Sequence, residues 1–141
     1  MKWVTREKVH VDRVACPWLI KNFVDKEAVF VFVPKDTDPN TIKDGNPFDM
    51  KGVELGHHGT DCSFDAIIHK YGLTHDPALT KLQEIVRLAD TDRGNENPLA
   101  FALDVLGRGY RLITMNDHET LEKEFVLYDA LYAYFKHQQD Q

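Results

Sequence analysis

Ala28-Val29-Phe30-Val31-Phe32-Val33 is the clearest strand signal in this sequence, a continuous run of β-branched and aromatic residues that ends at Pro34. Uninterrupted apolar runs of this kind are typical of strands that are buried on both faces. We therefore expect residues 28–33 to form a central strand with helices packed around it. Shorter strand-like patterns at residues 3–5 and, more weakly, 50–55 predict the rest of a small mixed β-sheet.

Five helices are predicted around this sheet from apolar residues at helical spacing and from residues that start or stop helices. The first begins with Pro17 in its first turn, where a missing N–H is tolerated, and continues to about residue 24. The others are expected at residues 63–71, 77–90, 98–106 and 117–137. Gly72 and Gly107 are expected to end the second and fourth helices, and Asp76-Pro77 to start the third. The sequence thus predicts an α+β fold, a single compact domain over residues 1–141 with a small mixed sheet wrapped by about five helices.

Size and charge narrow the range of functions. A chain of 141 residues is long enough to bury a core without disulfide bonds. Its net charge of −6 argues against a dedicated nucleic-acid or anionic-membrane binder, since such proteins present a basic stripe. No segment approaches the roughly 20 apolar residues that span a bilayer. With only two cysteines, a reduced cytoplasmic setting is the default expectation.

The densest group of reactive side chains lies in the stretch Glu54-Leu55-Gly56-His57-His58-Gly59-Thr60-Asp61-Cys62-Ser63-Phe64-Asp65. It combines two imidazoles, one thiol and three carboxylates just before and within the start of a predicted helix. His58 and Cys62 have a spacing that suits a metal clip. A structural zinc site would need a second cysteine nearby, however, and Cys16 is distant, so we do not expect one.

A mixed imidazole–carboxylate metal site is the sharper prediction. His58, Asp65 and Asp90 converge if the helices at 63–71 and 77–90 pack antiparallel across their short connection. Nitrogen and oxygen ligands of this kind suit a divalent transition metal such as Mn, Fe or Zn. His57 and Glu54 are reserve ligands, and with Cys62 they are expected to border the metal or a bound anion.

A purely structural interpretation of the same residues stays open. In that interpretation His58 satisfies a buried backbone group, Asp61 caps a helix, and Cys62 packs as a small apolar residue. Arg13 has two interpretations as well. It lies just before a predicted helix start and could form the cationic wall of an oxyanion pocket that contains His58. Alternatively, it pairs with Asp12 or with a carboxylate on another helix.

Several blocks of sequence together resemble a known family. They are Trp3-Val4-Thr5-Arg6, Asp12-Arg13-Val14-Ala15-Cys16-Pro17-Trp18-Leu19-Ile20, the apolar strand at residues 29–33, His58 with Cys62-Ser63-Phe64-Asp65, Ile85-Val86-Arg87-Leu88-Ala89-Asp90, and Tyr128-Asp129-Ala130-Leu131-Tyr132. The chain is similar, over nearly its whole length, to the chromate resistance protein family and specifically to the ChrB C-terminal domain. Asp65 stands where glutamate is expected in relatives.

The resemblance implies a link to chromate resistance, since full-length members act as chromate-responsive regulators. This chain begins at that domain's own first strand, so DNA binding is not expected of it. We expect a cytoplasmic metal- or oxyanion-binding domain whose partners are a small oxyanion or a metal ion. A small metalloenzyme with a redox or Lewis-acid metal is the alternative, with no catalytic residue assigned, and an interaction module is a third. The wide apolar face of residues 117–137 predicts burial on two sides or a homodimer contact.

Overall fold

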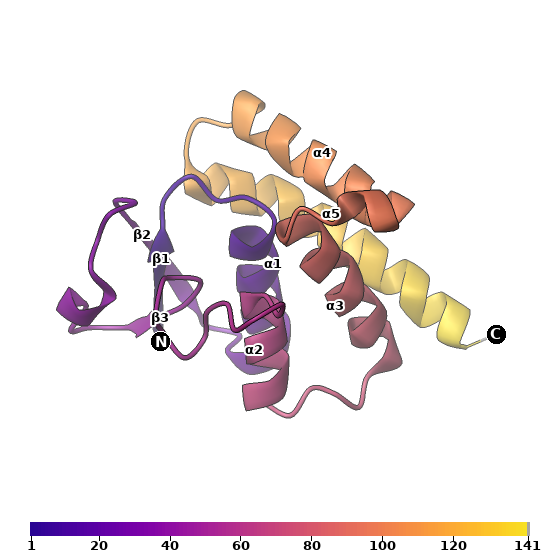
Figure 1. Cartoon of the computed structure of the whole chain (residues 1–141), viewed down its shortest axis with the longest axis horizontal. Helices are drawn as coiled ribbons and strands as arrows, with labels where there is room; N and C mark the ends of the chain where they lie inside the picture. The colour runs from indigo at the N-terminus through magenta and orange to yellow at the C-terminus, as the bar shows by residue number, and fades with distance from the viewer. Residues whose placement is uncertain (141) are drawn as a thin grey trace.

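The β-sheet has the strand order β2-β1-β3 and is parallel throughout in the computed structural model, which describes residues 1–140. Strand β1 (Lys2–Arg6) pairs with β2 (Val29–Val33) along its whole length and with the short β3 (Asn46–Pro47) on its other side. The helices lie to one side of this sheet (Figure 1). The α+β class is confirmed, and within it the sheet is parallel where a mixed sheet was expected.

The strand predicted to be central is an edge strand. Val29 at the start of β2 is 55% exposed, whereas Trp3, Val4 and Thr5 of β1 are buried. An apolar run predicts burial of side chains, but it does not say whether another strand pairs on each side. The β1 strand takes the centre because β2 and β3 both pair with it. Residues 50–55, the weakest strand prediction, form turns instead.

Helix α1 (Asp12–Leu19) begins five residues before the position predicted, so Pro17 lies inside the helix and not in its first turn. Proline has no N–H to donate to the carbonyl group four residues earlier, which is that of Arg13. A π-helical turn (Ile20–Val24) continues the helix. Val11, just before α1, has a φ of 40°, so the chain turns sharply between β1 and the helix.

Helices α2 (Ser63–Lys70) and α3 (Pro77–Asp90) match their predictions closely. Asp76 caps α3, because its side chain accepts hydrogen bonds from the N–H groups of Ala78 and Leu79. Gly72 follows α2 with a φ of 64°, the left-handed conformation that glycine tolerates best. The residue that caps α2 is Cys62, whereas Thr60 or Asp61 was predicted.

Helix α4 (Pro98–Ile113) does not end at Gly107 as predicted, but continues for six residues beyond it. Gly107 is buried, and a Cβ atom there would lie 3.0 Å from Nδ1 of His10. This glycine therefore provides close packing and not a helix stop. Helix α5 (Asp117–Gln139) packs against α1, α3 and α4, so burial on two or more sides explains its wide apolar face. Short 3₁₀ turns span Pro39–Thr41 and Gly94–Glu96.

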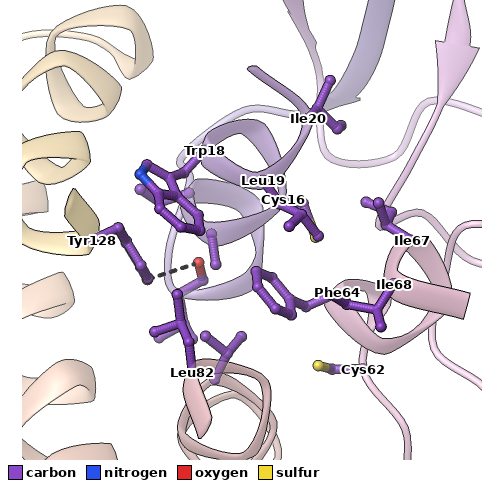
Figure 2. Close-up of a cluster of buried hydrophobic side chains, with 14 of the residues drawn as sticks. Cys16, Trp18, Leu19, Ile20, Cys62, Phe64, Ile67, Ile68, Leu82 and Tyr128 are labelled. Atoms are coloured by element: carbon purple, nitrogen blue, oxygen red, sulfur yellow. Dashed lines mark hydrogen bonds between the residues drawn. The ribbon is translucent and has the colours of Figure 1, made fainter. Parts of the chain in front are cut away.

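The core gathers side chains of α2, α3 and α5 around those of α1 (Figure 2). Trp18 of α1 packs against Tyr128 of α5, whose hydroxyl donates a hydrogen bond to the carbonyl oxygen of Val11 at 3.3 Å. Phe64 and Ile67 of α2 fill the other side of the same cluster. Among residues 1–140, no helix is both long and apolar enough to cross a membrane. This packing sets the start of α1 and the start of α2 beside the end of α3.

Candidate functional site

Asp12, the first residue of α1, holds two helices together through a buried carboxylate. Its Oδ2 accepts a hydrogen bond from the N–H of Ser63 at 2.6 Å, and its Oδ1 accepts one from the N–H of Phe64 at 3.1 Å. These two groups are free N–H groups of the first turn of α2, which a negative charge stabilises. The thiol of Cys16 also donates to Asp12 at 3.3 Å. The carboxyl group of Asp12 is thus fixed in place and removed from water.

An imidazole faces this carboxylate and two others. Nε2 of His57 lies 2.9 Å from Asp90 Oδ2, 3.3 Å from Asp49 Oδ1 and 3.5 Å from Asp12 Oδ2. Asp90 ends α3, whereas Asp49 and His57 come from the loop before α2. Asp49 is further held by the hydroxyl of Ser63, which donates to it at 2.7 Å. We call Asp12, Asp49, His57 and Asp90 the His57 cluster.

The electrostatics of the His57 cluster favour a bound cation. Hydrogen bonds to Asp12, Asp49 and Asp90 raise the pKa of His57 to about 12, so the ring carries a proton at neutral pH. Burial raises the pKa of Asp12 to about 7, and the hydrogen bond to His57 opposes that rise. One imidazolium thus neutralises part of a strongly negative site.

A metal ion could take the place of that proton. One ligand atom from each of Asp12, Asp49 and His57 fits within 4.8 Å of the other two, which is close enough to share one ion. The oxygen and nitrogen donors match those of divalent transition metals. Since Nε2 is the atom that carries the proton toward the carboxylates, the proton and a metal would compete for the same atom.

A basic pocket lies on the other side of Asp49. Nε of Arg13 is 3.3 Å from Asp49 Oδ2, and Nη2 of Arg6 donates to the Asp49 carbonyl oxygen at 3.3 Å. Of the described residues, those lining this pocket of about 240 Å³ are Arg6, Glu7, Lys8, Arg13, Lys35 and Arg111. Burial lowers the pKa of Arg13, and the positive charges of Arg6 and Arg111 lower it further against the effect of Asp49. Five cations and one carboxylate therefore share one pocket.

The three metal ligands predicted from sequence lie in three different environments. Asp90 is part of the His57 cluster. His58 is exposed, and its Nε2 donates to the carbonyl oxygen of Glu54 at 2.8 Å. Asp65 is buried against Arg87, whose Nη2 lies 2.6 Å from its Oδ1. The packing of α2 and α3 does not bring Asp65 to His58 or Asp90, because a carboxylate at the third position of a helix reaches back to its own cap, here the N–H of Cys62.

Asp65 has no free oxygen for a ligand in this arrangement. It accepts hydrogen bonds from Gln83 Nε2 at 2.6 Å and from the Cys62 N–H at 2.8 Å, in addition to Arg87. Burial alone would raise the pKa of Asp65, but the hydrogen bonds from Arg87 and Gln83 lower it. Burial also raises the pKa of the Cys62 thiol well above its usual range. Asp65 therefore joins α2 to α3 through Gln83 and Arg87.

The remaining predicted residues divide between the two sites and the outer surface. Arg13 lines the basic pocket, and not a pocket with His58 as expected. His57, a reserve ligand in the sequence analysis, is the centre of the His57 cluster. Glu54 forms an ion pair with Lys70 at 3.1 Å, on the surface beside His58. Whether a metal binds to any of these residues stays a prediction.

Sequence reasoning missed Asp12 and Asp49. Asp12 was considered only as an ion-pair partner of Arg13, and Asp49, just before the weak strand predicted at residues 50–55, was not considered. Their spacing from His57 and Asp90 gives no motif, because the four residues come from three separate segments: the start of α1, the loop before α2 and the end of α3. The one available signal was an acidic residue at the start of a helix, a position that often caps its own helix and here caps another.

The comparisons with known proteins agree with each other. The family described as "ChrB, C-terminal domain" matches residues 3–135. A relative named "Protein ChrB" from Cupriavidus metallidurans is 31% identical over 134 residues. That alignment covers 95% of this chain and 40% of the relative, so the chain spans less than half the length of that protein. No solved structure matches the chain.

Proposed function

We propose that this chain, which belongs to the ChrB C-terminal domain family, binds a tetrahedral oxyanion of the chromate and sulfate class. Binding of this anion is how the chain would contribute to chromate resistance. The observation that carries the proposal is the basic pocket of Arg6, Lys8, Arg13, Lys35 and Arg111. It occurs in a chain whose net charge is −6, so the gathering of cations is local and not a consequence of composition.

Two of the five cations of the basic pocket, Arg13 and Arg6, are held in place before any anion arrives. Arg13 is anchored by Asp49 and by the carbonyl oxygen of Glu7, which accepts from its Nη1 at 3.2 Å. Arg6 is anchored on the Asp49 backbone. A guanidinium group has five N–H donors, so each arginine keeps donors for the oxygens of a ligand. Charge-assisted bonds to a doubly charged oxyanion are among the stronger hydrogen bonds in proteins.

A divalent transition metal at the His57 cluster is the second candidate, and it rests on the three carboxylate oxygens that face Nε2 of His57. Mn, Fe or Zn would take Asp12, Asp49 and His57 as ligands, with Asp90 beside the ring. If a coordination position stays open to water, the site would suit a small metalloenzyme. We place either action in the cytoplasm, since both cysteines are free thiols.

Titration calorimetry with sodium chromate and sodium sulfate at pH 7.5 tests the oxyanion proposal. Arg13→Ala and Arg111→Ala remove one guanidinium each from the basic pocket, and each should weaken binding by about 1.5–3 kcal/mol. Lys81→Ala is the matched control, because Lys81 is an exposed cation on α3 outside the pocket. Equal affinity in all three variants, or no heat of binding in the unmodified protein, would overturn the proposal.

A further inference from the structure

Helix α4 exposes an unusually apolar face. Of the twelve large hydrophobic side chains that are exposed among the described residues, seven lie between Leu99 and Met115. Phe101 is 59% exposed, Leu112 86% and Ile113 70%. Scattered apolar residues on a surface are ordinary, but a contiguous patch of this kind marks an interaction site. The helix is also the outermost of the helical layer (Figure 1).

The exposed residues of α4 form two ridges with a groove between them. At 100° per residue, Phe101, Val105 and Leu112 fall on one line along the helix. Leu99, Leu106 and Ile113 fall on a second line about 120° away. Ala102 and Gly109 lie between these lines, whereas the charged residues of Pro98–Ile113 lie outside them on the remaining arc. The groove and both ridges are therefore uncharged. We call this surface the α4 face.

The two inner glycines of α4 have opposite environments. A Cβ on Gly107 would press against His10, so core packing explains that glycine. A Cβ on Gly109 would meet nothing within 4 Å. A glycine inside a helix costs about 1 kcal/mol relative to alanine, and contacts within residues 1–140 do not account for that cost at Gly109. A small residue in an exposed groove does allow another helix to approach closely.

We propose that the α4 face is the contact between two copies of this chain, with α4 packed antiparallel against α4 of the second copy. The two-fold axis would pass between Val105 and Leu106, midway between Ala102 and Gly109. Each small residue then opposes the other type in the partner, and the ridges of one helix enter the groove of the other. An uncharged face suits an uncharged partner, since burying an unpaired charge there would be costly.

The size of the α4 face agrees with a stable dimer. The six exposed side chains of the two ridges offer on the order of 600 Å² of apolar surface, if a full side chain of this size presents about 150–200 Å². A standard interface buries about 800 Å² on each partner, roughly a tenth of the surface of a small protein. The whole surface of this protein is 7941 Å², so the α4 face is close to that share.

Sedimentation velocity of the full chain at protein concentrations from about 1 to 100 μM tests this proposal. The unmodified protein should sediment as a dimer at the upper concentrations. Leu112→Glu and Phe101→Glu should each raise the dimer dissociation constant by 100-fold or more. The reason is that two-fold symmetry places two added carboxylates, one from each copy, in the buried interface. Val126→Glu is the matched control. Val126 is 66% exposed on the side of α5 opposite its buried residues, so this variant should stay dimeric.

Circular dichroism distinguishes a lost interface from a lost fold. Both α4 variants should keep the helical signal and a cooperative thermal transition, since neither side chain is buried in the monomer. If the unmodified protein sediments as a monomer at 100 μM, the proposal is overturned. This holds even if the α4 face is then found to bind another protein segment or a lipid vesicle. A dimer that persists in both α4 variants would overturn it as well.

Discussion

Two buried aspartates hold the start of helix α2, and they are neutralised in different ways. Asp65 closes the capping box at Cys62 and is paired with the guanidinium of Arg87. Asp12 caps the N–H groups of Ser63 and Phe64 and faces the imidazole of His57. The pKa of Asp65 is lowered by its partners despite burial, whereas that of Asp12 is raised to about 7 because burial prevails.

The difference lies in what each partner can exchange. An arginine keeps its proton at any pH that a protein tolerates, so the Asp65–Arg87 pair is permanent. An imidazole can lose its proton or give its place to a metal ion, so the negative charge around Asp12 can be balanced in more than one way. We infer that Asp65 stabilises the fold and that Asp12 serves a binding site, although both cap the same helix.

The largest effect that can break this comparison is on stability. Asp65→Asn should lower the free energy of unfolding by about 2–3 kcal/mol, because it leaves Arg87 without its buried counter-charge. Asp12→Asn should cost only about 1 kcal/mol, since the amide oxygen still accepts from one of the two backbone N–H groups and the cost of burying a charge disappears. Urea unfolding at pH 7 measures both values.

Asp36→Asn is the control for this measurement, because Asp36 is an exposed carboxylate in the loop after β2 and its loss should change stability little. An equal cost at Asp12 and Asp65 would contradict the division into one structural and one exchangeable aspartate.

The sequence predicted the helices of this comparison better than the sites. Periodicity and caps located α2 and α3 almost to the residue, because Asp76-Pro77 and Gly72 act on local backbone conformation. Gly107 misled the prediction for α4, since a glycine that stops a helix and one that admits close packing look alike in sequence. Only the position of His10 distinguishes them.

The sites could be predicted only in part, because tertiary packing assembles them. Asp90 and His57 were named as candidates from their residue types, and Arg13 from its place before a helix. Asp65 was as good a candidate as Asp90 by residue type and position. No local sequence pattern reveals that Arg87 and Gln83 donate hydrogen bonds to the carboxylate oxygens of Asp65. Asp12 and Asp49 of the His57 cluster are 37 residues apart in the sequence, so only the fold brings them together.

The next largest effect is on metal binding, which compares two neighbouring histidines, His57 and His58. If the His57 cluster binds a metal, His57→Ala and Asp90→Ala should each weaken Zn²⁺ or Mn²⁺ binding by about 10–100-fold. Binding should also weaken as the pH falls, because the metal must displace the proton on Nε2 of His57. Elemental analysis and calorimetry of protein purified without a chelating tag measure these changes.

His58→Ala is the matched control for the metal measurement, since the His58 ring is held by Glu54 outside the cluster. The sequence-based trio of His58, Asp65 and Asp90 predicts the reverse, with loss of metal in His58→Ala. Asp65→Asn should leave metal affinity unchanged, provided that the folded fraction is matched. The experiment therefore decides between the two ligand sets.

The smallest expected effect is on the pH dependence of stability. The Asp65–Arg87 pair should affect the acid limb of the curve of unfolding free energy against pH, and the His57 cluster around Asp12 the alkaline limb. The pKa of Asp65 is lowered in the folded state, so its contribution is present above the usual carboxyl pKa of 3.8 and is lost as the pH falls below that value. The pKa of His57 is raised from 6.5 to about 12, so its contribution is complete below pH 6.5 and declines as the pH rises toward 12. Asp12 adds to that decline between pH 3.8 and about 7, because the folded state favours its protonated form there.

Asp65→Asn should flatten only the acid limb, and His57→Gln only the alkaline limb between about pH 7 and 10. The alkaline change should be modest, since His57 is 44% exposed and solvent screens its charge. Urea unfolding at a series of pH values measures both limbs, and an alkaline limb that is identical with and without His57 would mean that the imidazole does not neutralise the cluster.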